Sequence, residues 1–222
     1  MVGRIRVDLQ ESHLSANRTI LVFGLLCIAL VCLYGSGAHA ADNNPDDRVK
    51  AGMAKLADAA HVNGNQDEMG EQKLEGAIRL FLEEYTDVNY AARLIIANHW
   101  GAATPQQRDR FVEAFNNQVT HLLVRLVPNI DFEAIRIEPF HGDIEETPFV
   151  IQAAFRTFEE ETIPLDLVMH ELNGRWLIFD VMVEGVSYVK TYRYQFSGEI
   201  ADTGLDATIQ RFEIRSIARG DR

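Results

Sequence analysis

The chain has 222 residues and carries 33 Asp and Glu residues against 21 Lys and Arg residues, which gives a formal net charge of −12. A chain this acidic is a poor electrostatic match to DNA, RNA or an anionic lipid surface. The composition therefore excludes nucleic-acid binding and charge-driven attachment to membranes as main functions.

The first 40 residues have the features of a cleavable secretion signal. Three arginines come first, an uncharged apolar run occupies residues 20–34, and the small-residue pattern Ala38-His39-Ala40 follows. This order is typical of exported proteins, and the 15 residues of the run fall short of the roughly 20 that a membrane-spanning helix needs. We therefore expect cleavage near Ala40 and a location outside the cytoplasm, with an uncleaved membrane anchor as the alternative.

Removal of that signal leaves residues 41–222, a length that suits a single domain with a sizeable core. Both cysteines, Cys27 and Cys32, lie inside the signal, so disulfides contribute nothing to the stability of the mature chain. The mature chain carries 31 acidic residues against 18 basic residues, a net charge of −13. We expect it to be soluble and not to insert stably into a membrane.

The first part of the mature chain, residues 47–127, predicts helices. Apolar residues recur at helical spacing from Val49 and again from Leu74. The clearest helix begins at Thr104-Pro105, a capping residue followed by proline at the first helical position, and its apolar residues come every three or four positions until Pro128. Residues 186–216 predict two further helices by the same criterion.

Residues 133–183 predict an antiparallel sheet of four strands, at 134–140, 149–158, 163–172 and 176–183. These segments are rich in β-branched and aromatic residues and are separated by turn residues. Asn173-Gly174 predicts a type I′ turn, which joins the last two strands as a hairpin. The fold class is therefore α+β.

The hairpin gives an expected register in which Val168 faces Phe179 and Asp166 faces Val181. With a turn at Glu160-Glu161, one face of the sheet carries an apolar set: Phe149, Ile151, Ala153, Phe155, Val168, Leu177, Phe179, Val181 and Val183. The opposite face is also apolar, although an antiparallel sheet normally needs only one dry face. Helices must cover the second face, and either they complete the core or part of the apolar lining faces a cavity for an apolar ligand.

Motifs for catalysis or metal binding are missing from the sequence. The mature histidines do not show a recognisable metal-ligand spacing, and the nucleophile-elbow, phosphate-loop and dinucleotide motifs do not occur. Asp180 or Asp166 is a candidate general base if it projects into an apolar cavity, with His170 or Tyr188 as partner. The favoured alternative is that Asp180 bonds to backbone amides of the turn at 184–186.

Three tyrosines follow the sheet, at Tyr188, Tyr192 and Tyr194, with Lys190 and Arg193 between them. Such a cluster suits the mouth of a pocket, where a polar tip and an apolar body are both useful. It equally suits a packed helix whose charges lie in water.

Four short motifs occur in order within residues 173–196. They are Gly174-x-Trp176, Asp180-Val181, Glu184-Gly185-Val186-Ser187 and Tyr192-Arg193-x-Gln195-Phe196. Their order and spacing resemble the signature of the MlaC family, the periplasmic phospholipid carriers of Gram-negative bacteria. The run 100–108 followed by Phe111 and Phe115 resembles that family's central helix entry, and Gly204-Leu205-Asp206 resembles its last helix. The resemblance extends over residues 74–212.

The resemblance implies a fold in which helices clasp a curved, mostly antiparallel four-stranded sheet, with a nuclear-transport-factor-like core and an apolar lipid cavity. It implies a soluble periplasmic carrier that shuttles phospholipid and maintains outer-membrane lipid asymmetry. Its partners would be an outer-membrane lipoprotein–porin complex and the MCE-domain subunit of an inner-membrane ABC transporter. It implies no catalytic residue, and no cofactor besides the phospholipid cargo.

The candidate lipid contacts come from the more apolar face of the expected sheet, with two residues near its mouth: Phe149, Ile151, Phe155, Val168, Leu177, Phe179 and Val181, then Val186 and Tyr188. The opposite face is the alternative lining. Two other functions stay open, a small periplasmic enzyme of nuclear-transport-factor-like fold with Asp180 as general base, and a ligand-free adaptor between membrane complexes.

Overall fold

The computed structural model describes residues 44–62, 68–142, 147–156 and 162–218, all of which fall in one compact unit spanning Asp42–Arg222. The expected signal segment, the cleavage position and the turn at Glu160-Glu161 lie outside the described residues. Among the helices that are described, none is both long and apolar enough to cross a membrane.

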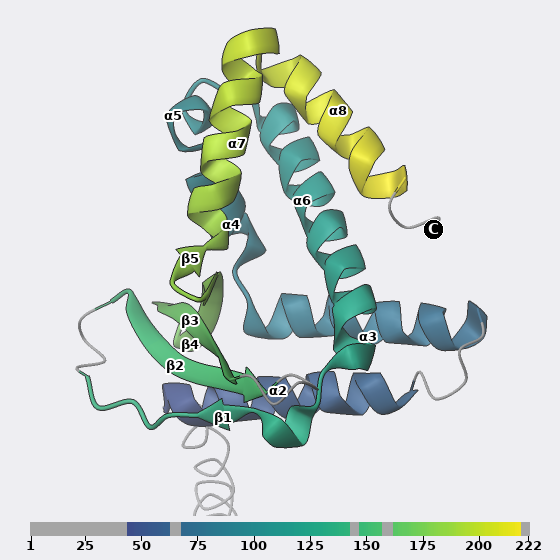
Figure 1. Cartoon of the computed structure of the whole chain (residues 1–222). Helices are drawn as coiled ribbons and strands as arrows, with labels where there is room; N and C mark the ends of the chain where they lie inside the picture. Colours follow the sequence, from purple (N-terminus) through teal and green to yellow (C-terminus); the bar gives the residue numbers. More distant parts are fainter. Residues whose placement is uncertain (1–43, 63–67, 143–146, 157–161, 219–222) are drawn as a thin grey trace, which may run out of the picture. The chain divides into compact units, whose positions relative to one another are not determined.

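The described chain is a helical first half, a sheet and two final helices (Figure 1). The helices and strands, in chain order, are α2 (Pro45–Val62), α3 (Glu68–Tyr85), α4 (Val88–Ile95), α5 (Ala97–Trp100), α6 (Pro105–Leu126), β1 (Arg136–Ile137), β2 (Phe149–Arg156), β3 (Thr162–Leu172), β4 (Arg175–Val183), β5 (Val186–Ser187), α7 (Tyr188–Thr203) and α8 (Leu205–Ala218). Two short 3-10 turns, Val127–Asn129 and Phe132–Ala134, join α6 to β1. The α+β prediction is confirmed.

The sheet has five strands in the order β1-β2-β3-β4-β5, and all neighbouring strands are antiparallel. The predicted count of four was wrong because Val186 and Ser187 pair with β4 as β5 before α7 begins. Ser187 then caps α7, since its hydroxyl accepts a hydrogen bond from the backbone N–H of Lys190 at 3.0 Å. The helix predicted from residue 186 therefore starts at Tyr188.

The helix predicted from Thr104-Pro105 is confirmed as α6. The Thr104 hydroxyl accepts the backbone N–H of Gln107 at 3.2 Å, and the Gln107 side chain accepts the backbone N–H of Thr104 at 3.0 Å. This reciprocal capping box satisfies two backbone donors at the helix start, which explains why the helix begins there.

The first predicted strand, 134–140, is reduced to Arg136–Ile137. Phe132–Ala134 forms a 3-10 turn instead, and the backbone N–H of Phe140 donates to the carboxylate of Asp46 in α2 at 2.9 Å. One further backbone bond joins Glu138 to Gln152 of β2, and by Phe140 the chain bonds to α2 instead.

The Asn173-Gly174 turn is confirmed, with φ of 54° and 76° at its two positions. Leu172 pairs with Arg175 and His170 pairs with Leu177, as expected, but a β-bulge interrupts the pairing between Val168 and Met169. Beyond the bulge Val168 pairs with Asp180, so Phe179 is the extra residue. The expected Val168–Phe179 and Asp166–Val181 pairs were therefore wrong.

The expected alignment of β2 with β3 was wrong by three residues, because a turn at Glu160-Glu161 would have paired Phe149 with Leu172. Phe149 pairs with Met169, and Phe155 pairs with Ile163. A shift by an odd number of residues moves every side chain of a strand to the opposite face. The apolar set expected on one face is consequently divided between two faces.

We call these the α2 face and the α4 face, after the helices that contact them. The α2 face carries Phe149, Ile151, Phe155, Ile163, Leu165, Leu167, Met169, Trp176, Ile178, Val181 and Val183, and the α4 face carries Val150, Asp166, Val168, His170, Leu172, Leu177, Phe179, Asp180 and Met182. Both faces meet helices, α2 on one side and α4 and α7 on the other. The expectation that helices clasp the sheet is confirmed, and β2 curves along its length in Figure 1.

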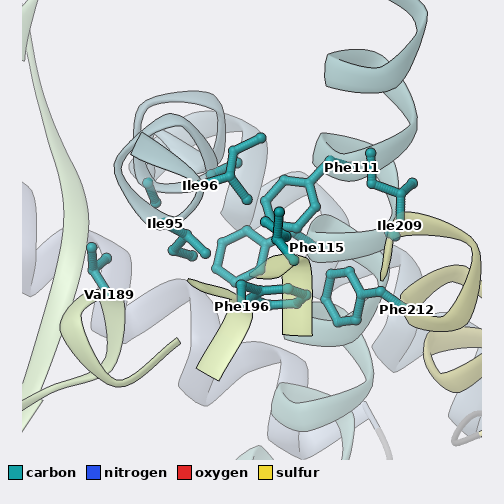
Figure 2. Packing of buried hydrophobic residues seen from close by; sticks show 12 residues of the cluster. Ile95, Ile96, Phe111, Phe115, Val189, Phe196, Ile209 and Phe212 are labelled. Carbon is teal, nitrogen blue, oxygen red and sulfur yellow. The ribbon is translucent and has the colours of Figure 1, made fainter. Parts of the chain in front are cut away.

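Three clusters of buried apolar side chains form the described core. The helical cluster joins α4, α6, α7 and α8 through Ala91, Ala92, Ile95, Ile96, Phe111, Ala114, Phe115, Val189, Phe196, Ile200, Ile209 and Phe212. Figure 2 shows its centre, where the ring of Phe196 meets the rings of Phe111 and Phe212 at 5.1 and 4.8 Å. A second cluster lies between α2 and α3 with Val127, and a third, the sheet cluster, joins Val49 of α2 to the α2 face.

Candidate functional site

The α2 face is closed over much of its length by the sheet cluster. Val49 of α2 packs with Phe149, Ile151 and Met169, all of them buried. The ring of Phe149 also meets the rings of Trp176 at 5.0 Å and Phe140 at 4.6 Å. Protein side chains therefore already fill this part of the face.

Other apolar side chains of the sheet are only half-buried. On the α2 face these are Phe155, Ile163 and Val183, and on the α4 face they are Val168, Phe179 and Met182. In the described part of the chain, none of the six belongs to or packs against one of the three core clusters.

Helix α6 also carries both buried side chains and less buried ones, and they lie along a single stripe of the helix. Phe111, Phe115 and Gln118 follow at steps of four and three, which places them on one side of the helix, and all three are buried. The same stripe continues to Leu122, which is half-buried, and to Leu126, which is 47% exposed. Helices α4, α7 and α8 cover the first half of the stripe but leave the second half uncovered.

We select seven half-buried side chains outside the clusters, six from β2, β3 and β4 and one from α6, and call them the uncovered apolar set: Leu122, Phe155, Ile163, Val168, Phe179, Met182 and Val183. Apolar side chains that are only half-buried and lie outside the core clusters are candidates for contact with an apolar ligand.

Comparison with known proteins identifies the family. The model of the MlaC protein family matches residues 54–213. The chain belongs to the MlaC family. This result confirms the resemblance drawn from the motifs in residues 173–196.

Two curated relatives and one solved structure are similar to this MlaC-family protein. The intermembrane phospholipid transport system binding protein MlaC of Haemophilus influenzae is 18% identical over 195 residues, 86% of this chain and 91% of the relative. The toluene tolerance protein ttg2D of Pseudomonas putida is 22% identical over 172 residues, which cover 76% of this chain and 80% of the relative. A phospholipid-binding protein of Ralstonia solanacearum, solved with a phospholipid, matches with a TM-score of 0.65 and 19% identity over 79% of this chain and 98% of that one. The last match shows that the fold is shared.

The nine candidate lipid contacts do not come together in this MlaC-family structure. Phe155, Val168 and Phe179 belong to the uncovered apolar set, whereas Phe149 and Ile151 lie in the sheet cluster and Val181 packs against it. Leu177 is buried, and Val186 and Tyr188 are 59% and 44% exposed. Their contact with lipid stays a prediction. Leu122, Ile163, Met182 and Val183 were not among the nine candidates, and the exposure of the three strand residues depends on a register that the sequence did not give correctly.

Asp180 holds α7 on the sheet. Its carboxylate accepts hydrogen bonds from the backbone N–H of Val181 at 2.8 Å, from the backbone N–H of Val189 at 3.0 Å and from the hydroxyl of Ser187. The favoured interpretation of Asp180 as a backbone-bonding residue is thus correct in kind, but its partners are Val181 of β4, Ser187 of β5 and Val189 of α7 and not backbone amides of the turn at 184–186.

The residues expected to assist Asp180 in catalysis have other surroundings. His170 meets Asp87, with 3.1 Å between its Nε2 and the Oδ2 of Asp87, and Tyr188 is 44% exposed at the start of α7. The pair of Asp87 and His170 was missed because the two residues are 83 positions apart in the sequence.

The tyrosines that follow the sheet differ in their exposure to solvent. Tyr192 packs edge-on against Phe115 at 5.7 Å, whereas Tyr194 is 87% exposed. The guanidinium of Arg193 donates to the backbone carbonyl of Leu94 at 2.7 Å. Most of this cluster is therefore a packed helix with polar groups toward water.

A pocket of about 520 Å³ lies beside α2 and α3. Its lining is mixed, with apolar and charged side chains: Lys55, Asp58, Ala59, Ala77, Leu80, Phe81, Glu83, Glu84, Tyr85 and Arg175. The charged rim and the volume suit a small polar group better than two acyl chains, which need about 1,000 Å³. The described residues contain no cluster of three or more metal-binding side chains.

Proposed function

We propose that this MlaC-family protein is a periplasmic phospholipid carrier that binds its cargo by the acyl chains and does not alter it. The observation that carries the proposal is the uncovered apolar set, because these side chains are half-buried but lie outside every described core cluster. Family membership and the phospholipid named for two of the similar proteins support the same cargo.

The energetics of such a carrier are demanding. Two chains of about 16 carbons, at about 0.8 kcal/mol per CH₂, cost roughly 25 kcal/mol if they enter water. The carrier must offset nearly all of this free energy with apolar contacts. We propose that the acyl chains lie against Leu122 of α6 and against the half-buried side chains of β3 and β4 (Val168, Phe179 and Met182).

The shuttle itself is the finer part of the proposal. We infer from the family resemblance that the carrier exchanges phospholipid with an outer-membrane lipoprotein–porin complex and with the MCE-domain subunit of an inner-membrane ABC transporter. The expected secretion signal and the acidic composition favour a carrier that works in the periplasm and leaves membranes readily. Maintenance of outer-membrane lipid asymmetry would follow from this exchange.

The proposal excludes a catalytic role. Asp180, the candidate base, already accepts hydrogen bonds from three donors, on Val181, Ser187 and Val189, and neither His170 nor Tyr188 is among them. A carboxylate bound in this way is a structural group rather than an available base.

Lipid extraction from the purified mature protein, followed by mass spectrometry, tests the proposal. We expect co-purified phospholipid and uptake of labelled phospholipid from vesicles. Absence of both, in a protein that unfolds cooperatively, would refute the carrier and leave the ligand-free adaptor as the better interpretation.

A further inference from the structure

The N-terminal end of α4 is attached to the sheet at the β-bulge. The backbone N–H of Asp87 donates to the carbonyl oxygen of Ile178 in β4 at 2.8 Å, and Thr86 forms an isolated bridge with the same residue. Ile178 comes directly before Phe179, the extra residue of the bulge. The irregularity in β4 thus coincides with the point where a helix joins the sheet.

The side chain of Asp87 makes two contacts. One carboxylate oxygen accepts the backbone N–H of Tyr90 at 2.8 Å and caps α4, and the other lies 3.1 Å from Nε2 of His170 in β3. The side chains of Asp87 and His170 are only 10% and 16% exposed. A hydrogen bond shielded from water to this degree is stronger than one at the surface.

Three rings surround this contact. The ring of Tyr90 lies 4.6 Å from His170 and 5.0 Å from Phe179, and the rings of His170 and Phe179 are 5.1 Å apart. We call Asp87, Tyr90, His170 and Phe179 the latch. Two of its residues come from the α4 side and two from the α4 face of the sheet.

The latch borders the proposed lipid contacts. Phe179 belongs to the latch and to the uncovered apolar set, and Val168 lies two residues before His170 on the same face. On its other side α4 contributes Ala91, Ala92 and Ile95 to the helical cluster. The latch is therefore a link between that cluster and the part of the sheet where we place the cargo.

A second link lies at the start of α7, where Asp180 binds Ser187 and Val189. Because α7 follows β5 directly, this second link persists if the latch is released. Helix α4 has only eight residues, too few to be stable alone, so its position depends on such contacts. Release of the latch would let the helical cluster move relative to the α4 face, with the backbone bond from Asp87 to Ile178 and the Asp180 link as the attachments that remain.

We propose that the Asp87–His170 contact is a positioning contact that limits how fast phospholipid enters and leaves the carrier. This inference rests on the proposed function. It assigns no lipid contact to His170; the pair acts through the placement of α4 against Phe179 and Val168.

The test compares lipid exchange in two variants of His170. His170→Phe keeps a ring for Tyr90 and Phe179 but removes the bond to Asp87, whereas His170→Gln keeps a side-chain N–H donor for Asp87. We expect about tenfold faster exchange of labelled phospholipid between vesicles and the full mature protein for His170→Phe. His170→Gln should restore a rate close to that of the unchanged protein.

Glu213→Gln is the matched control, because it removes the charge of another ion pair between two elements. That pair joins Arg110 of α6 to Glu213 of α8, and both side chains are 30% exposed. Its exchange rate should stay unchanged. If His170→Phe does not fold, Asp87→Asn replaces it, since Asn still caps α4 but loses the charge that holds His170.

Equal exchange rates in the unchanged protein, His170→Phe and Asp87→Asn would overturn the inference, and so would an equal acceleration by Glu213→Gln. Failure of the unchanged protein to take up any phospholipid refutes the proposed function instead. The two failures are thus separated by the behaviour of the unchanged protein.

Discussion

The helical cluster and the uncovered apolar set contain the same kinds of side chain in opposite circumstances. Phe111 and Leu122 lie on one stripe of α6, yet Phe111 is 0% exposed under the rings of Phe196 and Phe212 whereas Leu122 is half-buried and outside the described clusters. The difference teaches that apolar character alone does not separate a structural residue from a ligand contact. Cover by other elements decides it.

The largest expected effect concerns the helical cluster, whose side chains are covered by other helices. Phe111→Ala should lower the free energy of unfolding by about 4 kcal/mol, because it leaves a cavity among the rings of the helical cluster. Urea unfolding followed by circular dichroism measures the change. A loss below about 1 kcal/mol would mean that the cluster is not packed as described.

A smaller effect is expected at the link between the sheet and α7. Asp180→Asn should cost about 2 kcal/mol of unfolding free energy, since an amide replaces the carboxylate that accepts from Val181, Ser187 and Val189. Phospholipid occupancy of the folded variant, measured by mass spectrometry, should not change. A folded variant that keeps its stability but loses a measurable catalytic turnover would favour the enzyme over the carrier.

A substitution in the uncovered apolar set should change lipid binding more than stability. Leu122→Asn should lower phospholipid occupancy severalfold but change the free energy of unfolding by only about 1 kcal/mol, because the side chain is half-buried. Leu80→Asn is the control, since Leu80 is 67% exposed on α3. Similar lipid occupancy in the two variants would show that α6 does not contact the cargo.

The smallest expected effect is the pH dependence of the stability that the Arg110–Glu213 ion pair contributes between α6 and α8. Hydrogen bonds from Arg110 hold the pKa of Glu213 below its ordinary value of 4.5, although partial burial opposes this. A lowered pKa in the folded state means that the ion pair stabilises the protein above about pH 4.5 and that this contribution disappears as the pH falls through the folded-state pKa. Pairs of this exposure contribute about 0.2–1 kcal/mol.

The measurement is the free energy of unfolding between pH 6 and pH 3, compared with that of Glu213→Gln. The difference between the two proteins should vanish in acid. A difference that persists at the lowest pH would assign the stabilisation to packing and not to charge.

Local signals in the sequence correctly predicted much of the fold. Thr104-Pro105 predicted the start of α6, and Asn173-Gly174 predicted the turn between β3 and β4, because both signals depend on residues close together in the chain. Family membership was also accessible, since the motifs around Trp176 and Tyr192 keep their order and spacing.

The candidate site was predictable only in part. Phe155, Val168 and Phe179 were expected to line the site and are half-buried, but Phe149 and Ile151 proved to be covered by α2. A single bulge at Phe179 and a three-residue shift of β2 against β3 produced this difference. Neither irregularity has a signal in the spacing of apolar residues.

The sequence by itself determined the class of fold, the main turns, the helix caps and the family, because these follow from local backbone chemistry and from motif order. Only the tertiary structure decided which apolar side chains are covered, which face of the sheet meets α2, and that Asp87 finds His170. Those outcomes depend on contacts between segments far apart in the chain, where a shift of one residue reverses the direction of every side chain.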